Sequence, residues 1–286
     1  MSHPEKLSSI EAILEQLESN RYIADQLLAT VIYLSHHMNK PIFLEGEPGV
    51  GKTEIAIVLA QIFESRLIRL QCYEGLDASS ALYEWNYPKQ LLRIKMDEHS
   101  DRTPDEIGQV IYSEPYLLKR PLLDAILSSQ NDHPVLLIDE LDRADEEFEA
   151  FLLEILSDFQ VSIPEIGTVK ATHKPMVVIT SNRTRDIHDA LKRRCLYHWI
   201  DYPDLEKEKQ IIQARIPGIE ESLAAQVAGF MQTIRREDLM KKPGVSESLD
   251  WAEALIKLNQ GVLDQQKISH FVEQSCWISS FQIPFN

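Results

Sequence analysis

The sequence predicts an α/β protein in which a parallel β-sheet carries a phosphate-binding loop and is followed by an all-helical region. Short apolar runs alternate with helical patterns up to about residue 202, as strands joined by helical crossovers do. From residue 203 onward only helical periodicity remains, which predicts a smaller helical domain at 203–286. A chain of 286 residues is long enough to form both parts.

Five short apolar runs are expected to form the strands of the sheet. We predict them at 41–45, 66–71, 134–138, 175–180 and 196–200. The first domain, 1–202, also contains N-terminal helices within 1–38, at about 5–20 and 21–37. An aromatic- and proline-rich insertion is expected at about 73–120, and an alternating segment with a Pro…Gly turn predicts a hairpin at about 159–172. The helices of the second part are predicted at 203–216, 219–235, 247–260 and 264–275.

A phosphate-binding loop of the pattern GxxxxGK[ST] follows the first strand and precedes a helical pattern, which is the setting that this motif needs. Its glycines let backbone N–H groups turn toward a phosphate, and the helix that begins there adds its positive N-terminal dipole. We expect Lys52 to reach the β- and γ-phosphate oxygens and the Thr53 hydroxyl to bind Mg²⁺. The predicted nucleotide-binding residues are Gly46, Glu47, Pro48, Gly49, Val50, Gly51, Lys52, Thr53 and Glu54.

Two adjacent carboxylates, Asp139 and Glu140, follow the strand at 134–138. Beside a phosphate-binding loop, the first carboxylate is expected to hold Mg²⁺ and the second to deprotonate an attacking water. Successive strand residues point to opposite faces, so the strand must end here for Glu140 to turn toward the phosphate. Asn182, at the end of the next apolar strand, is expected to hold that water or the γ-phosphate. The alternatives are a solvated acidic helix start for the pair and a simple turn residue for Asn182.

A basic block, Lys192-Arg193-Arg194, lies just before the last strand. It can be an exposed basic helix end, which the helix dipole favours. It can also place an arginine at the γ-phosphate of a neighbouring subunit, where the charge of the transition state is neutralised. The second interpretation requires an oligomer.

Composition limits the class of partner and the compartment. A formal net charge of −16 repels nucleic-acid phosphates, so we expect a protein partner and no nucleic acid. No apolar stretch approaches the ~20 residues that span a bilayer, and the N-terminus lacks the plan of a secretory signal. The three cysteines are far apart and form no metal or disulfide pattern, so a reducing cytoplasm is the expected location.

Together these motifs resemble the AAA+ ATPases, and among them the MoxR group and its CoxD-like branch. The resemblance covers about residues 20 to 255. It is carried by the segments Leu44 to Glu54, Gln71-Cys72-Tyr73-Glu74-Gly75-Leu76-Asp77, Tyr83-Glu84-Trp85-Asn86-Tyr87, Ile138 to Asp145, Thr180 to Asp186 and Ala190 to Cys195.

The resemblance implies specific roles for these residues. Gly46 to Thr53 corresponds to Walker A, Asp139-Glu140 to Walker B and Asn182 to sensor 1. Arg194, with Arg193 as the second choice, corresponds to the arginine finger. The segments at about 73–120 and 159–172 correspond to the helix-2 insertion and the pre-sensor hairpin, and 203–286 corresponds to the helical lid.

The resemblance also implies an activity and partners. AAA+ members of this group form rings, usually hexamers, and hydrolyse ATP with Mg²⁺ as chaperones that remodel a client protein. A von Willebrand A domain protein is often their partner. The CoxD-like branch is linked to maturation of molybdenum hydroxylases such as carbon monoxide dehydrogenase.

One block departs from the MoxR pattern. The lid of that group usually carries a sensor 2 arginine, but Ser248 stands at the corresponding position of Gly244-Val245-Ser246-Glu247-Ser248. Either lid closure is weaker or Arg235 or Arg236 substitutes. The apolar tail, residues 276–286, matches no motif and is expected to pack on the lid or on another subunit.

Two other classes of function compete with a protein-remodelling ATPase. A clamp-loader or restriction-type nucleic-acid NTPase would explain the Arg193-Arg194-Cys195 segment, but the acidic charge opposes it. A small-molecule kinase would explain the phosphate loop but leaves Asn182, the basic block and the helical region without a role.

Overall fold

The centre of the protein is a parallel sheet of five strands, which confirms the predicted fold class. The computed structural model describes residues 7–98, 102–128, 133–237, 239 and 241–257. The strands lie in the order β2-β5-β8-β1-β9. Their bounds are β1 (Ile42–Gly46), β2 (Leu67–Gln71), β5 (Val135–Asp139), β8 (Met176–Ser181) and β9 (Leu196–Ile200), each within one residue of its prediction.

Both faces of the sheet are covered, because successive residues of the central strands enter different clusters of buried side chains. On β5, Leu136 and Ile138 pack into one cluster and Val135 and Leu137 into the other. The first cluster is covered by α5 (Ala78–Leu82), α8 (Pro121–Ser128) and α9 (Glu146–Asp158). The second is covered by α2 (Ile10–Ser19), α3 (Gln26–Met38) and α4 (Lys52–Ile62). The carboxyl ends of the strands therefore form a rigid, two-sided platform.

The two N-terminal helices begin about five residues later than the sequence periodicity predicts. The side chains of Ser9 and Asp25 accept hydrogen bonds from backbone N–H groups of the first turns of α2 and α3, and these caps set the starting points. The segment between the helices therefore lies outside both of them. It places Tyr22 and Ile23 beside the phosphate-binding loop.

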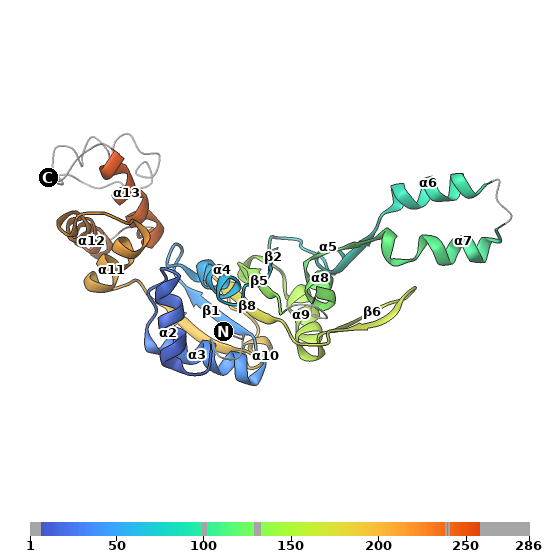
Figure 1. The fold of residues 1–286 in the computed structure, drawn as a ribbon, viewed down its shortest axis with the longest axis horizontal. Helices are drawn as coiled ribbons and strands as arrows, with labels where there is room; N and C mark the ends of the chain where they lie inside the picture. Colours follow the sequence, from blue (N-terminus) through green and yellow to red (C-terminus); the bar gives the residue numbers. More distant parts are fainter. Residues whose placement is uncertain (1–6, 99–101, 129–132, 238, 240, 258–286) are drawn as a thin grey trace.

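The insertion forms an arm that projects from the sheet. It runs through β3 (Tyr83–Trp85), α6 (Tyr87–Asp97), α7 (Pro104–Ile111), the short helix η1 (Glu114–Tyr116) and β4 (Leu117–Lys119). β3 and β4 pair as an antiparallel base, and α6 and α7 extend from it as a helical hairpin (Figure 1). The predicted helix start at Thr103 is confirmed, because its side chain and that of Glu106 form a capping box. The predicted hairpin is also present as β6 (Gln160–Ile163) and β7 (Gly167–Lys170).

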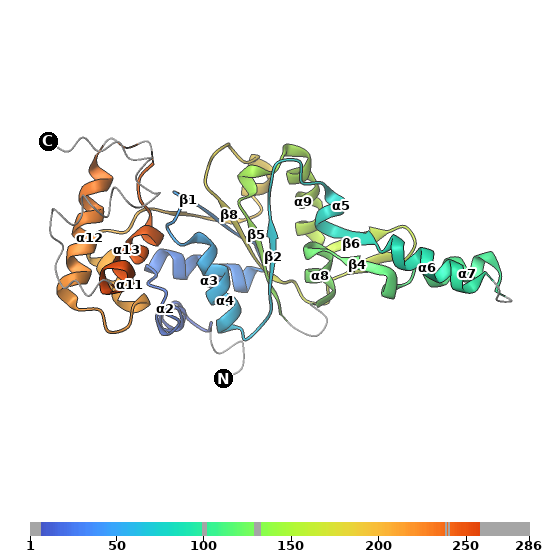
Figure 2. The same cartoon turned by 90° about the horizontal axis from the view of Figure 1, so that it is seen from above.

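The C-terminal part of the described chain is helical. It consists of α11 (Leu205–Arg215), α12 (Glu221–Arg236) and α13 (Val245–Lys257), which enclose a cluster of buried side chains of their own. These helices lie at the opposite end of the molecule from the arm, with the sheet between them (Figure 2). The helix predicted at 264–275 and the tail at 276–286 lie outside the described residues. In the described part of the chain, no helix is both long and apolar enough to cross a membrane.

Candidate nucleotide-binding site

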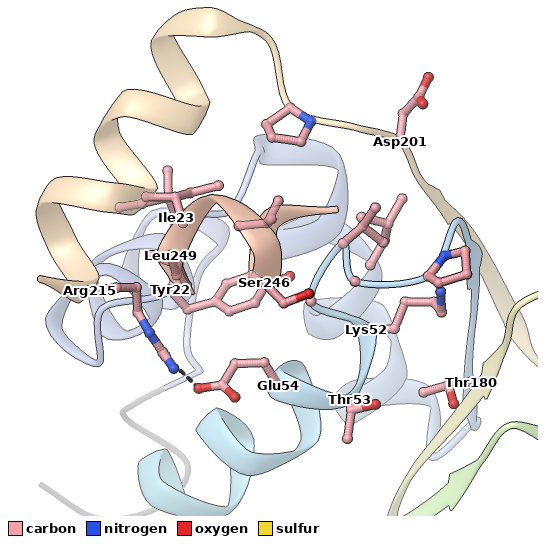
Figure 3. A pocket seen from close by; sticks show the side chains of 18 of the residues that line it. Tyr22, Ile23, Lys52, Thr53, Glu54, Thr180, Asp201, Arg215, Ser246 and Leu249 are labelled. Atoms are coloured by element: carbon pink, nitrogen blue, oxygen red, sulfur yellow. Dashed lines mark hydrogen bonds and ion pairs between the residues drawn. The ribbon is translucent and has the colours of Figure 1, made fainter. Parts of the chain in front are cut away.

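A pocket of about 390 Å³ lies at the carboxyl ends of the central strands, between the sheet and the C-terminal helices. Its floor is the loop between β1 and α4, and α11 and α13 form its opposite wall (Figure 3). Carboxyl ends of parallel strands are where open α/β sheets bind their ligands. Of the predicted nucleotide-binding residues, those from Pro48 to Glu54 line this pocket.

The loop has the backbone shape that its glycines allow. Gly49 and Gly51 have φ angles of 77° and 96°, in the left-handed region that favours glycine. Gly51 precedes α4 without a side-chain cap, so the first N–H groups of this helix are available to an anion. A Cβ atom on Gly46 would lie 2.2 Å from the carbonyl oxygen of Ile200, so only glycine fits there.

Lys52 is buried at the start of α4. Its ammonium group donates hydrogen bonds to the carbonyl oxygens of Gly46, at 2.7 Å, and Glu47, at 2.6 Å. Burial lowers the pKa of Lys52 to about 8, although nearby carboxylates, with Asp142 first among them, oppose this shift. The lysine therefore lies folded against the loop whose phosphate it is expected to bind.

Asp139 connects the phosphate loop with two neighbouring strands. One of its carboxylate oxygens accepts hydrogen bonds from the Thr53 hydroxyl, at 3.0 Å, and the Thr180 hydroxyl, at 2.6 Å. The other oxygen pairs with Arg69 of β2 at 2.5 Å. A carboxylate beside two hydroxyl groups is a set of hard oxygen donors, which fits a Mg²⁺ ion and its water shell.

Glu140 lies directly after the end of β5, in the left-handed conformation with φ 55° and ψ 52°. This bend turns its side chain away from the strand direction and toward the pocket that it lines. One carboxylate oxygen accepts from Gln71 at 3.0 Å and from Arg143 at 3.1 Å. The other lies 3.5 Å from the side-chain nitrogen of Asn182. The structure thus brings together Glu140 and Asn182, the two residues expected to handle the attacking water.

The loop that carries Asn182 is held by a second acidic side chain. Asp142 is buried, and its carboxylate accepts from the backbone N–H groups of Asn182, at 3.2 Å, and Thr184, at 2.9 Å. The Thr184 hydroxyl adds a bond of 2.7 Å. This carboxylate fixes the end of β8 against the end of β5.

The two arginines of the basic block lie away from this pocket. They follow α10 (Asp189–Lys192), and neither is among the described residues that line the pocket. Arg193 is exposed, and the exposed Arg194 side chain donates to the carbonyl oxygen of Leu153 on α9 at 3.0 Å. The structure therefore does not bring Arg193 or Arg194 to the nucleotide site of their own chain.

Of the alternatives that the missing lid arginine left open, substitution by Arg235 is not supported by the structure. Its guanidinium group is buried and forms two bonds of 2.6 Å with the buried carboxylate of Glu208. Ser248 donates to the same carboxylate, at 2.5 Å, so both residues belong to a polar network inside the helical region. Arg236 is exposed at the end of α12 and, like Arg235, is not part of the described pocket lining.

Other residues bring the helical region to the pocket. Arg215 of α11 forms an ion pair with Glu54 of α4 at 2.5 Å, at the end of the pocket away from Lys52 (Figure 3). At the start of α13, the N–H groups of Val245 and Ser246 donate to the carbonyl oxygen of Gly49 at 2.8 and 3.2 Å. A Cβ atom on Gly244 would lie only 2.7 Å from the Cα atom of Gly49, so this approach is backbone to backbone.

Sequence reasoning missed several polar residues of the site. They are Arg69, Gln71, Asp142, Thr180 and Arg215. A signal existed for two of them: on β2, Arg69 and Gln71 stand two residues apart and so share one face. This spacing points to the site only when β2 is known to lie beside β5, where Gln71 is opposite Asp139.

Comparisons with known proteins agree with this geometry. The family model described as AAA domain (dynein-related subfamily) matches residues 41–195. An uncharacterized protein of Staphylococcus haemolyticus is 26% identical over 248 residues, which cover 84% of this chain and 85% of that protein. An uncharacterized protein of Staphylococcus epidermidis is 26% identical over 229 residues, with 78% of each chain covered.

Among solved structures, two variants of the RuvB protein of Thermotoga maritima have the same fold. The first is 14% identical with a TM-score of 0.50, and the match covers 93% of this chain and 70% of that one. The second is 16% identical with a TM-score of 0.50, and covers 92% and 68%. At such identities the similarity concerns the fold alone.

Proposed function

Because the chain belongs to the AAA domain family (dynein-related subfamily), an AAA+ ATPase family, we propose that it hydrolyses ATP with Mg²⁺ as a ring of identical subunits and uses the energy to remodel a client protein. One observation carries the hydrolytic part of the proposal. Glu140 and Asn182 face each other beside the phosphate-binding loop, while Asp139 lies against Thr53. A base, a polar holder and a metal-binding pair thus converge on one pocket.

Each residue has a distinct task in this proposal. Lys52 and the N–H groups at the start of α4 bind the phosphates. Thr53 and Asp139 hold Mg²⁺, which when bound neutralises phosphate charge. Glu140 takes a proton from the attacking water, and Asn182 orients that water or the γ-phosphate.

The cation that stabilises the transition state comes from a neighbouring subunit. Lys207 and Arg215 of the C-terminal helices line the pocket, and Arg215 is paired with Glu54, away from Lys52. Arg193 and Arg194, in contrast, are exposed and are not among the described residues that line their own site. An arginine delivered from an adjoining copy completes the site, as the family resemblance implies, and a hexameric ring is the expected assembly.

Client engagement is assigned to the projecting arm and the neighbouring hairpin. The α6–α7 arm exposes Leu91 and Leu92, each 60% accessible, and β6–β7 exposes Ile166 near its turn. The net charge of −16 favours a protein client over nucleic acid. In the MoxR-type interpretation the client is a metalloenzyme such as a molybdenum hydroxylase, a von Willebrand A domain protein assists, and the complex works in the cytoplasm.

The test is ATP turnover per subunit as a function of protein concentration. We expect turnover to rise steeply through the concentration at which rings assemble, measured in parallel by light scattering. Arg194→Ala, or Arg193→Ala if that residue is the finger, should lower turnover by about 10³-fold without loss of assembly. A turnover that stays constant on dilution below assembly, or that survives both substitutions, would contradict the trans arrangement.

A further inference from the structure

A buried carboxylate next to the phosphate-binding loop has no task in the mechanism described above. Glu45 is the residue of β1 directly before Gly46, and its accessibility is only 2%. It does not line the nucleotide pocket among the described residues. It lies instead between β8 and β9, opposite Ser181 and Trp199 in the sheet register.

Three segments meet at Glu45. Its carboxylate accepts a hydrogen bond from the Ser181 hydroxyl at 3.2 Å, and Ser181 precedes Asn182. The same oxygen faces the ammonium group of Lys192 at 3.8 Å, and Lys192 precedes Arg193. The third contact is to β9, where burial and then a hydrogen bond from Tyr197 to Glu45 raise the pKa of the tyrosine.

Ser181 extends these contacts toward the loop after β8. Its hydroxyl oxygen also accepts from the backbone N–H of Arg183 at 3.0 Å, so it holds the turn that contains Asn182. Glu45 is therefore itself the residue before the phosphate loop, and it contacts the residue before Asn182 and the residue before the arginine pair. The Glu45 carboxylate thus contacts Ser181, which supports the chain's own site, and Lys192, which belongs to the basic block proposed to act on a neighbouring subunit.

Stability alone does not explain this arrangement. A buried carboxylate costs free energy unless it is well paired, and replacing a buried ion pair by well-packed hydrophobic residues of similar volume is often neutral or stabilising. Here the carboxylate has two hydroxyl partners, Tyr197 and Ser181, the latter at 3.2 Å, and the ammonium group of Lys192 stays at 3.8 Å. A charge kept in such surroundings is more consistent with a positioning role than with a contribution to folding.

We propose that Glu45 is a positioning residue that holds the basic block, through Lys192, at the angle in which Arg193 and Arg194 reach the nucleotide of the adjoining subunit. The proposal rests on the proposed function, because it presupposes arginines that act in trans. It places the larger effect of Glu45 in the subunit that gives the arginine and the smaller one in the subunit that hydrolyses ATP. This asymmetry separates a positioning role from a local effect on the phosphate loop.

A mixing experiment measures the asymmetry. The donor subunit carries Glu140→Gln, which leaves its arginines intact and removes its own hydrolysis. The acceptor carries Arg193→Ala and Arg194→Ala, which leaves its own hydrolytic residues intact. Each is expected to be inactive alone, and an equal mixture is expected to regain turnover. Adding Glu45→Gln to the donor should lower the regained turnover by about threefold to thirtyfold. Adding it to the acceptor should lower turnover by less, since there it affects only the turn that contains Asn182.

Control variants distinguish a failure of the Glu45 inference from a failure of the proposed trans arrangement. Lys192→Met in the donor should reproduce the loss, and Glu18→Gln, on the exposed face of α2, should not. The Glu45→Gln donor should keep its melting temperature and its affinity for a fluorescent ATP analogue. Equal recovery with and without Glu45→Gln in the donor, or a loss in the acceptor that equals or exceeds the loss in the donor, overturns this inference. If the donor with Glu45 intact restores nothing, the trans arrangement itself is wrong, and the inference falls with it.

Discussion

The nucleotide pocket and the projecting arm differ in how their side chains are held. In the pocket, Asp139 and Glu140 are each fixed by three side chains from different elements. On the arm, α7 has no buried residue among those that the structure describes, and α6 buries only Gln90 and Asp97. The arm keeps its shape through local hydrogen bonds, such as the capping box at Thr103. The side chains of the pocket are thus fixed from several sides, whereas most side chains of the arm face water.

The contrast implies different responses to substitution. Where several partners fix one group, removal of a single atom changes geometry and leaves buried polar atoms unpaired. Where a side chain faces water, its removal costs little. The following substitutions test this difference, beginning with the largest expected effect.

Glu140→Gln should lower ATP turnover by about 10²–10⁴-fold, because the amide cannot accept the proton of the attacking water. The affinity for ATP should remain, since the phosphate loop is unchanged. Steady-state phosphate release and titration with a fluorescent nucleotide measure the two quantities. Glu147→Gln, at the exposed start of α9, is the matched control. Turnover near the wild-type value in the Glu140 variant would mean that another group is the base.

Gly244→Ala should weaken nucleotide binding by about tenfold or more, because the new Cβ atom would lie 2.7 Å from both the Cα atom of Gly49 and the carbonyl oxygen of Pro48. The start of α13 must then move away from the phosphate loop. Titration with a fluorescent nucleotide measures the affinity.

Gly229→Ala is the control for this substitution, because a Cβ atom added there, inside α12, would meet no heavy atom within 4 Å beyond the backbone of its own helix. It should stabilise the protein by about 0.5–1 kcal/mol, since alanine favours a helix interior. Equal nucleotide affinity in both glycine variants would show that the contact between Gly49 and Gly244 does not support binding.

Gln71→Ala should lower kcat by about tenfold and leave KM nearly unchanged. The amide donates to the Glu140 carboxylate at 3.0 Å, and a hydrogen bond to a charged group contributes about 1.5 kcal/mol or more. Initial-rate kinetics measure both constants. Gln61→Ala, on an exposed position of α4, should change neither. A rise in KM with constant kcat would indicate that Gln71 acts on binding instead.

Leu91→Ser together with Leu92→Ser should change the free energy of unfolding by no more than about 0.5 kcal/mol per site, because both side chains are exposed. Basal ATP turnover should also persist. Leu123→Ala, fully buried under the sheet, should cost about 2–5 kcal/mol. Chemical denaturation measures the stability of both variants. A large loss of stability in the arm variant would contradict the contrast between the two regions.

The sequence predicted features that lie within one continuous segment. It left open the contacts that depend on which strands and helices are neighbours in space. The phosphate loop and the five strands were readable because each is a local pattern of glycines or apolar residues. The strand order was not, so the contact of Gln71 with Glu140 could not be foreseen. Nor could the burial of Arg235, whose partner Glu208 lies 27 residues away on another helix. The left-handed turn at Glu140 also has no signal in a residue type that rarely adopts it.

The contact between Gly49 and Gly244 has a consequence for how motion is transmitted. It joins the phosphate loop to the first turn of α13 through peptide groups, with no flexible side chain in between to absorb a displacement. A shift of the loop by a fraction of an ångström therefore moves the rigid axis of α13 directly. In a ring, each release of phosphate in one subunit would change the angle between its helical region and the adjoining subunit.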